Sequence, residues 1–220
     1  MCEVKKHNVI TTSEGIGTEI HPFNNPDDLK GAKYLIVGTF PPHRFVSGDL
    51  KQNDVNWFYG SQDNSFWDLL GEFVGKFDSN AEQRKEKCKL NQIAFLDLFQ
   101  VIMRYGTLSG DEDIFPIEIV DLVYFFEKNE HIEFVLFTSK WVEKIAKKEY
   151  LRKNNQRLKE NGKKTDYIED KTFYRFECKS NVKVYTLPSP SPSNGDSFSG
   201  KKSKWEQIFD EIGFSKKTQK

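Results

Sequence analysis

Three short, almost uninterrupted apolar runs, residues 33–38, 93–99 and 131–137, constrain the fold of this chain more than any other feature. A strand covered on both faces reads as a continuous apolar run, whereas a half-exposed strand alternates. Segments with helical character lie between and after the runs: residues 65–74, 80–92, 117–129, 141–156 and 203–212. Strands alternating with helices predict an α/β fold in a single domain, with three layers (α/β/α) around a central, mostly parallel sheet.

The flanking segments are predicted to be less regular. Residues 1–25 contain several breakers and are expected to form an irregular N-terminal segment, followed by the domain over 26–214 and a disordered tail over 215–220. Pro116 is placed well for the first turn of the helix over 117–129. Residues 172–178 alternate apolar with polar side chains, which predicts a hairpin strand paired with residues 182–187.

Composition narrows the class of protein. The 220 residues hold 33 Lys+Arg and 33 Asp+Glu, and 14% are aromatic, enough large side chains to fill a core. No apolar run approaches the roughly 20 residues of a membrane helix, and the start does not resemble a secretory signal. Three cysteines without a Cys-x-x-Cys pair indicate a reducing compartment. We expect a cytoplasmic monomer without membrane contact.

Charge is balanced overall but segregated along the chain. A basic helical insertion over about 144–164 follows an acidic stretch over 109–130, and Lys201, Lys202 and Lys204 form a second basic cluster. Such segregation can steer a polyanion to one face. The alternative is a solvated helix face and a lysine-rich surface insertion.

Familiar cofactor motifs are absent from the sequence. It has no GxxxxGK[ST] loop, no GxGxxG after a strand, no GxSxG and no HExxH, and its four histidines stand in unrelated contexts. We therefore expect neither a cofactor nor a metal.

Three other segments carry the chemistry: residues 38–42 (GTFPP), 57–67 (WFYGSQDNSFW) and 187–195 (LPSPSPSNG). The first and third follow predicted strands, where ligands of α/β folds bind. Alternating Ser and Pro present hydroxyls and amides that suit phosphates, although a plain linker has the same composition. In the middle segment Asn64 can serve a ligand or simply cap the helix that follows.

Together the three segments resemble the uracil-DNA glycosylase superfamily, most closely its hypoxanthine (deoxyinosine) DNA glycosylase branch. That branch has a strand ending in Gly-x-x-Pro, a Tyr-Tyr-x-x-Pro-Arg-Asn-x-Phe-Trp segment and a late Leu-Pro-Ser-x-Ser-Pro-x-Asn motif, matched here by residues 38–41, 58–67 and 187–194. The chain departs from the superfamily at Phe40, where many members have Asn or Asp, and at Leu187, where they often have His. Gln62 and Asp63 replace the branch's Pro-Arg.

The resemblance implies hydrolysis of the N-glycosidic bond of a flipped hypoxanthine or uracil in DNA. Asn64 would hold the attacking water and Asp63 is a candidate general base, unless it is merely an exposed carboxylate at a helix start. The expected base-binding residues are Gly38, Thr39, Phe40, Pro41 and Tyr59, with core packing as the alternative for Phe40. The expected phosphate-binding residues are Ser189, Ser191, Ser193, Asn194, Lys201 and Lys202. Two other functions stay open: an inactive nucleic-acid-binding module of the same fold, and a small α/β enzyme acting on nucleosides.

Overall fold

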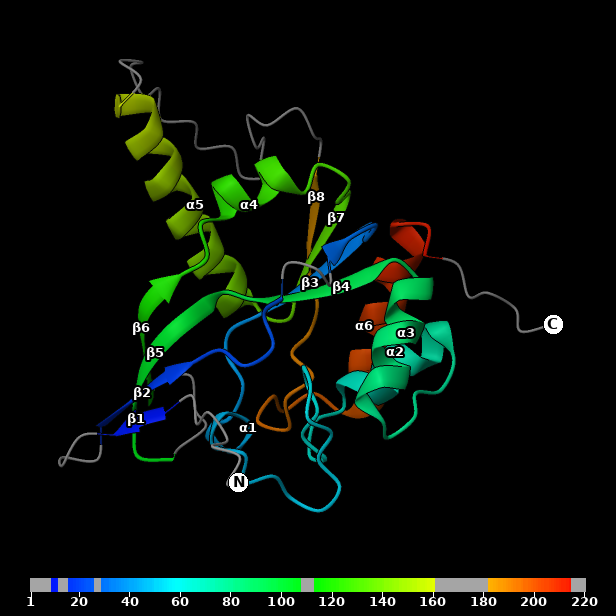
Figure 1. Cartoon of the computed structure of the whole chain (residues 1–220). Coiled ribbons are helices and arrows are strands. Elements are labelled where there is room, and N and C mark those ends of the chain that lie inside the picture. The colour runs from blue at the N-terminus through cyan, green and yellow to red at the C-terminus, as the bar shows by residue number, and fades with distance from the viewer. Residues whose placement is uncertain (1–8, 12–15, 26–28, 108–112, 161–181, 215–220) are drawn as a thin grey trace.

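The computed structural model describes residues 9–11, 16–25, 29–107, 113–160 and 182–214, which fold into two four-stranded sheets with helices around them (Figure 1). The central sheet has the order β4-β3-β7-β8 and every pairing in it is parallel. Its strands are β3 (Tyr34–Gly38), β4 (Ile93–Asp97), β7 (Phe134–Phe137) and β8 (Lys183–Thr186). The predicted α/β fold with a central parallel sheet is confirmed.

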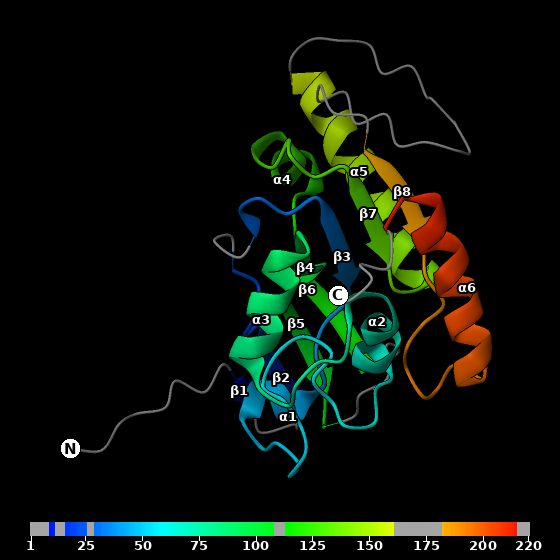
Figure 2. The same ribbon diagram turned by 90° about the vertical axis from the view of Figure 1, so that its right-hand side faces the viewer.

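The central sheet is covered on both faces. All residues of β3, β4 and β7 are buried, and alternate residues belong to different cores. Leu35 and Val37 pack with α4 (Leu122–Lys128) and α5 (Lys140–Glu160). Tyr34 and Ile36 pack in the other core, which holds α2 (Phe66–Val74), α6 (Phe198–Glu211) and Cys88 of α3 (Ala81–Leu90). Figure 1 shows these two groups of helices on opposite sides of the strands, as a three-layer fold requires, and Figure 2 views the molecule from the side of α2, α3 and α6.

A second, antiparallel sheet corrects part of the sequence prediction. Its order is β1-β2-β5-β6, with strands β1 (Val9–Thr11), β2 (Ile16–Ile20), β5 (Phe99–Tyr105) and β6 (Ile114–Ile119). The N-terminal segment is therefore not irregular throughout. The apolar run over 93–99 is also not a single strand, because the chain leaves the parallel sheet after Asp97 and continues as β5.

The helix expected over 117–129 is wrong in its first third. Pro116 lies within β6, at the end of the sheet order, where a strand needs no amide hydrogen on its outer side. The helix α4 begins at Leu122, and the Asp121 side chain caps it by accepting a hydrogen bond from the Tyr124 amide at 3.1 Å. The Asp121 carboxylate, rather than Pro116, therefore determines where the helix α4 begins.

The remaining predictions on the flanks have mixed outcomes. The helix over 141–156 is confirmed as α5, and the last helix starts earlier than predicted, at Phe198. The strand over 182–187 is confirmed as β8, which pairs in parallel with β7. Residues 172–178, its expected hairpin partner, and the tail over 215–220 lie outside the described residues. The short helix α1 (His43–Ser47) completes the fold.

Candidate active site at the carboxyl edge of the parallel sheet

The ends of all four parallel strands lie along one edge of the central sheet. Gly38, the last residue of β3, is in register with Asp97, the last residue of β4. Thr138 follows β7, and its amide donates to the Val37 carbonyl at 3.0 Å. Leu187 follows β8, and its amide donates to the Phe137 carbonyl at 2.7 Å. The first and third sequence segments therefore begin at the same edge of the sheet.

The middle segment is joined to the Ser/Pro segment by two hydrogen bonds. The amide and the hydroxyl of Ser65 both donate to the carbonyl of Pro190, at 3.3 and 2.9 Å. Asn64, the residue before Ser65, is thereby held beside the Ser/Pro turn. The Asn64 side-chain oxygen accepts from the Phe66 amide, the first of α2, at 2.9 Å, although the N-cap residue of that helix is Ser65. The side-chain amide nitrogen of Asn64, Nδ2, makes no hydrogen bond to the described residues, which leaves its two N–H donors for a ligand.

The Ser/Pro segment is an ordered turn rather than a loose linker. The Asn194 side chain donates to the Ser189 carbonyl at 3.2 Å, and the hydroxyls of Ser191 and Ser193 lie 2.7 Å apart. The indole of Trp205, a fully buried residue of α6, donates to the Pro188 carbonyl at 3.1 Å. These contacts fix the backbone of the turn, and Ser193 is exposed on it.

The lysines of the second basic cluster are engaged within the protein. Lys201 is only 4% exposed, and its ammonium donates to the Ser191 carbonyl at 2.8 Å, so it supports the turn from inside. Lys202 forms an ion pair with Glu72, and Lys204 forms one with Asp196 at 2.9 Å. The charges of Lys202 and Lys204 are therefore paired within the protein, whereas Lys201 contacts a neutral carbonyl.

Part of the basic charge of the helix α5 is paired in the same way. Lys153 and Arg157 lie within 4 Å of Asp121, and Arg157 also pairs with Glu127 at 2.9 Å. The acidic and basic stretches that look segregated in the sequence therefore face each other across α4 and α5. This pairing favours the interpretation of α5 as a solvated, internally paired helix.

Gly38 allows two side chains to approach the strand end. A Cβ on Gly38 would lie 2.3 Å from the Asp97 Oδ1 and 2.4 Å from the Tyr59 hydroxyl, closer than real Cβ atoms come. Only glycine therefore permits this arrangement. Tyr59 itself has a φ of 52°, an uncommon backbone conformation for a bulky residue and one that concentrates at functional sites.

The Tyr59 side chain is fixed on one face of its ring and at its hydroxyl. The ring stacks on Phe66 with centroids 4.1 Å apart, and the hydroxyl donates to Thr138 Oγ1 at 3.3 Å. Burial, and secondarily the Asp97 charge, raises the pKa of Tyr59 well above its usual range. The phenol is therefore a neutral group at the strand edge, and one of its ring faces is already occupied by Phe66.

The loop after β3 is held by a buried ion pair. Arg104 and Glu19 are each 1% exposed and pair at 3.0 Å, and a second guanidinium nitrogen of Arg104 donates to the Pro41 carbonyl at 3.0 Å. The Thr39 carbonyl accepts from the Phe99 amide at 3.1 Å. Phe40 is 8% exposed and belongs to the core, so core packing is what the structure shows for most of its ring.

Asp63 lies on the outer side of the middle segment. Its carboxylate pairs with Lys51 at 2.8 Å, and about half of each side chain is exposed. Two hydrogen bonds hold the residues before Asp63. The Gln62 amide donates to the Asp54 carboxylate at 2.9 Å, and the Arg44 guanidinium donates to the Ser61 hydroxyl at 2.7 Å. The Asp63 carboxylate is therefore an exposed group whose charge is balanced by Lys51.

Sequence reasoning missed a buried pair, His21 and Asp97. The imidazole Nε2 lies 2.9 Å from Asp97 Oδ2, and both side chains are more than nine-tenths buried. A carboxylate directly after the apolar run of β4 was a signal for Asp97. His21 gave none, because 76 residues separate it from its partner.

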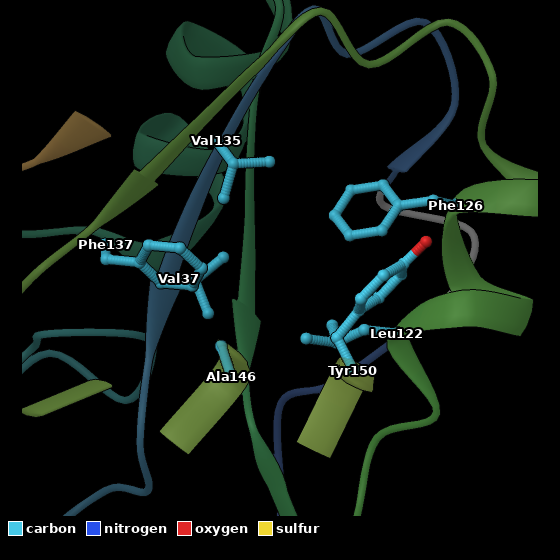
Figure 3. Close-up of a pocket in the computed structure, with 7 residues that line it drawn as sticks. All are labelled: Val37, Leu122, Phe126, Val135, Phe137, Ala146 and Tyr150. Atoms are coloured by element: carbon cyan, nitrogen blue, oxygen red, sulfur yellow. The ribbon is translucent and has the colours of Figure 1, made fainter. Parts of the chain in front are cut away.

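The apolar cavity shown in Figure 3 is not part of this edge. It lies between the sheet and the helices α4 and α5, and its free volume of about 10 Å³ is close to that of one water molecule. Its walls are Val37, Leu122, Phe126, Val135, Phe137, Ala146 and Tyr150. A void of this size and lining is a packing defect, too small for a nucleobase.

Two features are absent from the described part of the chain. Within it, no helix is both long enough and apolar enough to cross a bilayer. The same residues contain no group of three or more His, Cys, Asp or Glu side chains placed to hold a metal ion.

This chain is similar to two known proteins. Over 116 residues, half of this chain, the sequence is 29% identical to a hypoxanthine DNA glycosylase from Methanosarcina barkeri (strain Fusaro), of which the match spans 66%, just under two thirds. The fold is similar to the solution NMR structure of a protein from Methanosarcina acetivorans provisionally assigned as a uracil DNA glycosylase. That match has a TM-score of 0.53 and 21% identity, and it covers 84% of this chain and 92% of the other. No family model matches. The predicted resemblance to the uracil-DNA glycosylase superfamily and its hypoxanthine branch is confirmed.

Proposed function

We propose that this chain is a DNA glycosylase of base-excision repair that hydrolyses the N-glycosidic bond of a deaminated base, hypoxanthine or uracil. The observation that carries the proposal is the pair of hydrogen bonds from Ser65 to Pro190. These bonds hold Asn64 beside the Ser/Pro turn, at the edge of the sheet where ligands of such folds bind. The sequence similarity to a hypoxanthine DNA glycosylase supports the same activity.

The chemistry begins with extrusion of the target nucleotide from the duplex. A mispaired base is extruded at lower cost, which contributes to selectivity. Cleavage then passes through an oxocarbenium-like sugar and a departing base that carries negative charge. The free N–H groups of Asn64 hold the attacking water and orient the sugar, a positioning role that needs no titration. The loop over residues 39–41 faces the leaving base, and Tyr59 borders its site.

Binding of the DNA backbone falls to the Ser/Pro turn. Ser189, Ser191, Ser193 and Asn194 offer hydroxyl, carboxamide and backbone donors, which position phosphates without reading sequence. Lys201 holds the turn through the Ser191 carbonyl, and Lys202 contributes a charge that Glu72 already balances. We propose that the protein works on DNA as a monomer in the cytoplasm.

Base release from defined duplexes tests the proposal. Duplexes that contain deoxyinosine, uracil, or thymine opposite guanine are incubated with the wild-type protein and with Asn64→Ala, and abasic sites are cleaved with alkali. We expect cleavage by the wild type and at least a 100-fold loss in Asn64→Ala. The matched control is Asn80→Ala, because the Asn80 side chain likewise accepts from amides at a helix start, those of Glu82 and Gln83 in α3.

The same assay separates the alternatives. Binding of these duplexes without any abasic site would identify an inactive binding module. Hydrolysis of free deoxyinosine, with no reaction on DNA, would identify a nucleoside enzyme. Equal losses in Asn64→Ala and Asn80→Ala would assign Asn64 to a role at the helix start alone.

A further inference from the structure

We propose that Asp97 is the carboxylate that accepts the proton of the attacking water and that His21 is its positioning residue. This inference rests on the proposed function and names a second functional group in the same site. Neither residue belongs to the three sequence segments, and the two meet only because β2 and the turn after it pack against the end of β4.

Asp97 lies at the strand ends, and only one of its two carboxylate oxygens is hydrogen-bonded within the described residues. Its Oδ2 receives the hydrogen bond from His21, whereas its Oδ1 accepts no hydrogen bond from any described residue. That Oδ1 lies within 2.3 Å of the position a Cβ of Gly38 would occupy, next to the Tyr59 hydroxyl. Asp97 is only 6% exposed as a residue, but this oxygen is not among the fully buried atoms without a partner, so it is the part of the carboxylate that a water molecule or a substrate can reach. Its position beside Gly38 points to a ligand there.

The backbone of Asp97 is held by the same segment. The Asn24 carboxamide donates to the Asp97 carbonyl at 2.8 Å, and its oxygen accepts from the Asp97 amide at 2.9 Å. His21 and Asn24 therefore hydrogen-bond to both the side chain and the main chain of Asp97. The segment over 21–24 thus positions Asp97.

His21 is fixed as a neutral imidazole with its proton on Nε2. Its Nδ1 accepts from the amides of Phe23 and Asn24, at 3.1 and 3.0 Å, so this nitrogen carries no hydrogen. The Nε2–H therefore donates to Asp97 Oδ2. A neutral donor orients the carboxylate without cancelling its negative charge, which a cationic partner would do.

Packing fixes the orientation of the imidazole ring. The side chain of His21 is fully buried. It meets Phe40 edge-on at 5.2 Å and lies 5.6 Å from Phe58, centroid to centroid. The ring cannot turn without displacing the loop after β3, so the direction of Asp97 and the shape of that loop are coupled.

The proposed step balances as a hydrolysis. The water oxygen forms a bond to C1′ of the sugar while the bond between C1′ and the base nitrogen breaks, and the base leaves with the electron pair. One proton of the water passes to the Oδ1 of Asp97, and the departing base takes a proton from solvent. Asp63, exposed and paired with Lys51, is less well placed for this proton transfer.

Single-turnover base release with enzyme in excess tests the assignment, on the duplex that the wild type cleaves fastest. General base catalysis is worth about 100-fold or more in rate, so Asp97→Asn should be slower by at least that factor. Asp210→Asn, at an exposed carboxylate of α6, is the matched control and should stay within about threefold of the wild type, with wild-type affinity for the duplex. A wild-type rate in Asp97→Asn, or a large loss confined to Asp63→Asn, would overturn the inference.

A double-mutant cycle separates positioning by His21 from a general effect on folding. His21→Phe keeps the aromatic packing and removes the donor, and His21→Gln retains a donor near Nε2. We expect a rate loss of about tenfold or more in His21→Phe, partial rescue in His21→Gln, and no added loss from His21→Phe when Asp97 is already Asn. Additive losses would overturn the positioning role. If the wild type itself releases no base from any duplex, the proposed function fails as well, whereas loss of the inference alone leaves wild-type cleavage intact.

Discussion

Ser65 and Pro190, 125 residues apart, are joined twice: one carbonyl oxygen accepts both the amide and the hydroxyl of the serine. Few contacts tie the entrance of α2 to the turn after β8 so directly. Because Asn64 precedes Ser65, this link decides where the Asn64 carboxamide lies relative to the Ser/Pro turn.

Loss of the Ser65 hydroxyl should affect activity more than stability. Ser65→Ala removes one of the two bonds to Pro190, and a single hydrogen bond contributes about 1 kcal/mol to folding. We expect the free energy of unfolding, measured in urea, to fall by about that amount. Base release should fall by about tenfold, since a small misplacement of a positioning group is costly. Ser203→Ala, an exposed change in α6, should alter neither quantity.

Gly38 should not tolerate a methyl group. Gly38→Ala places a Cβ against the Asp97 carboxylate and the Tyr59 hydroxyl, and we expect a loss of about 1–3 kcal/mol in unfolding free energy, as for an overpacked core. Gly71→Ala in α2 is the control, because the nearest atom to its Cβ would be 3.7 Å away. There the helix propensity of alanine should stabilise the protein by about 0.5–1 kcal/mol. Equal effects of the two substitutions would contradict the close approach at Gly38.

Arg104 should be essential for the shape of the loop after β3. Arg104→Met removes the buried cation beside Glu19, which keeps only its contact with His43, and it also frees the Pro41 carbonyl. The free energy of unfolding should therefore fall by about 3 kcal/mol, the lower end of the cost of breaking a buried ion pair. Lys51→Ala breaks the exposed pair with Asp63 and should cost no more than about 1 kcal/mol. Urea denaturation of both variants measures the difference. A mild effect of Arg104→Met would show that the loop does not depend on the ion pair.

The lysines of α6 should contribute little to the salt dependence of DNA binding. Lys202 and Lys204 are already paired with Glu72 and Asp196, so few counterions are released when they approach a phosphate. Fluorescence anisotropy across a salt series should therefore give a log–log slope that changes by less than one unit in Lys202→Ala or Lys204→Ala. A larger change in slope would show that these lysines leave their partners to bind DNA.

The central sheet could be predicted because buried parallel strands leave an unmistakable apolar run. The antiparallel sheet could not, since β2 contains a glycine and β6 contains Pro116, and both residue types read as breakers when the edge position of β6 is unknown. The pairing of Gly17 with Arg104 joins segments far apart in the sequence, which no local pattern encodes.

Some features of the candidate site could also be predicted from the sequence, and others could not. The motifs that follow strands predicted that Gly38 and the Ser/Pro turn begin at the same edge of the sheet. Burial of Lys201 and the partners of Lys202 were not, because a lysine-rich helix start looks the same in sequence whether its ammonium groups face solvent or a carbonyl. The contact between His21 and Asp97 likewise exists only in the folded chain.

Release of a free base from DNA tests the central claim most directly. The wild-type protein is incubated with duplexes that contain deoxyinosine or uracil, and the released bases are separated by chromatography while the DNA is assayed for abasic sites. We predict that hypoxanthine or uracil appears in amounts equal to the abasic sites formed, and that both vanish in Asn64→Ala. Duplexes that stay intact after they have demonstrably bound the protein would contradict the account.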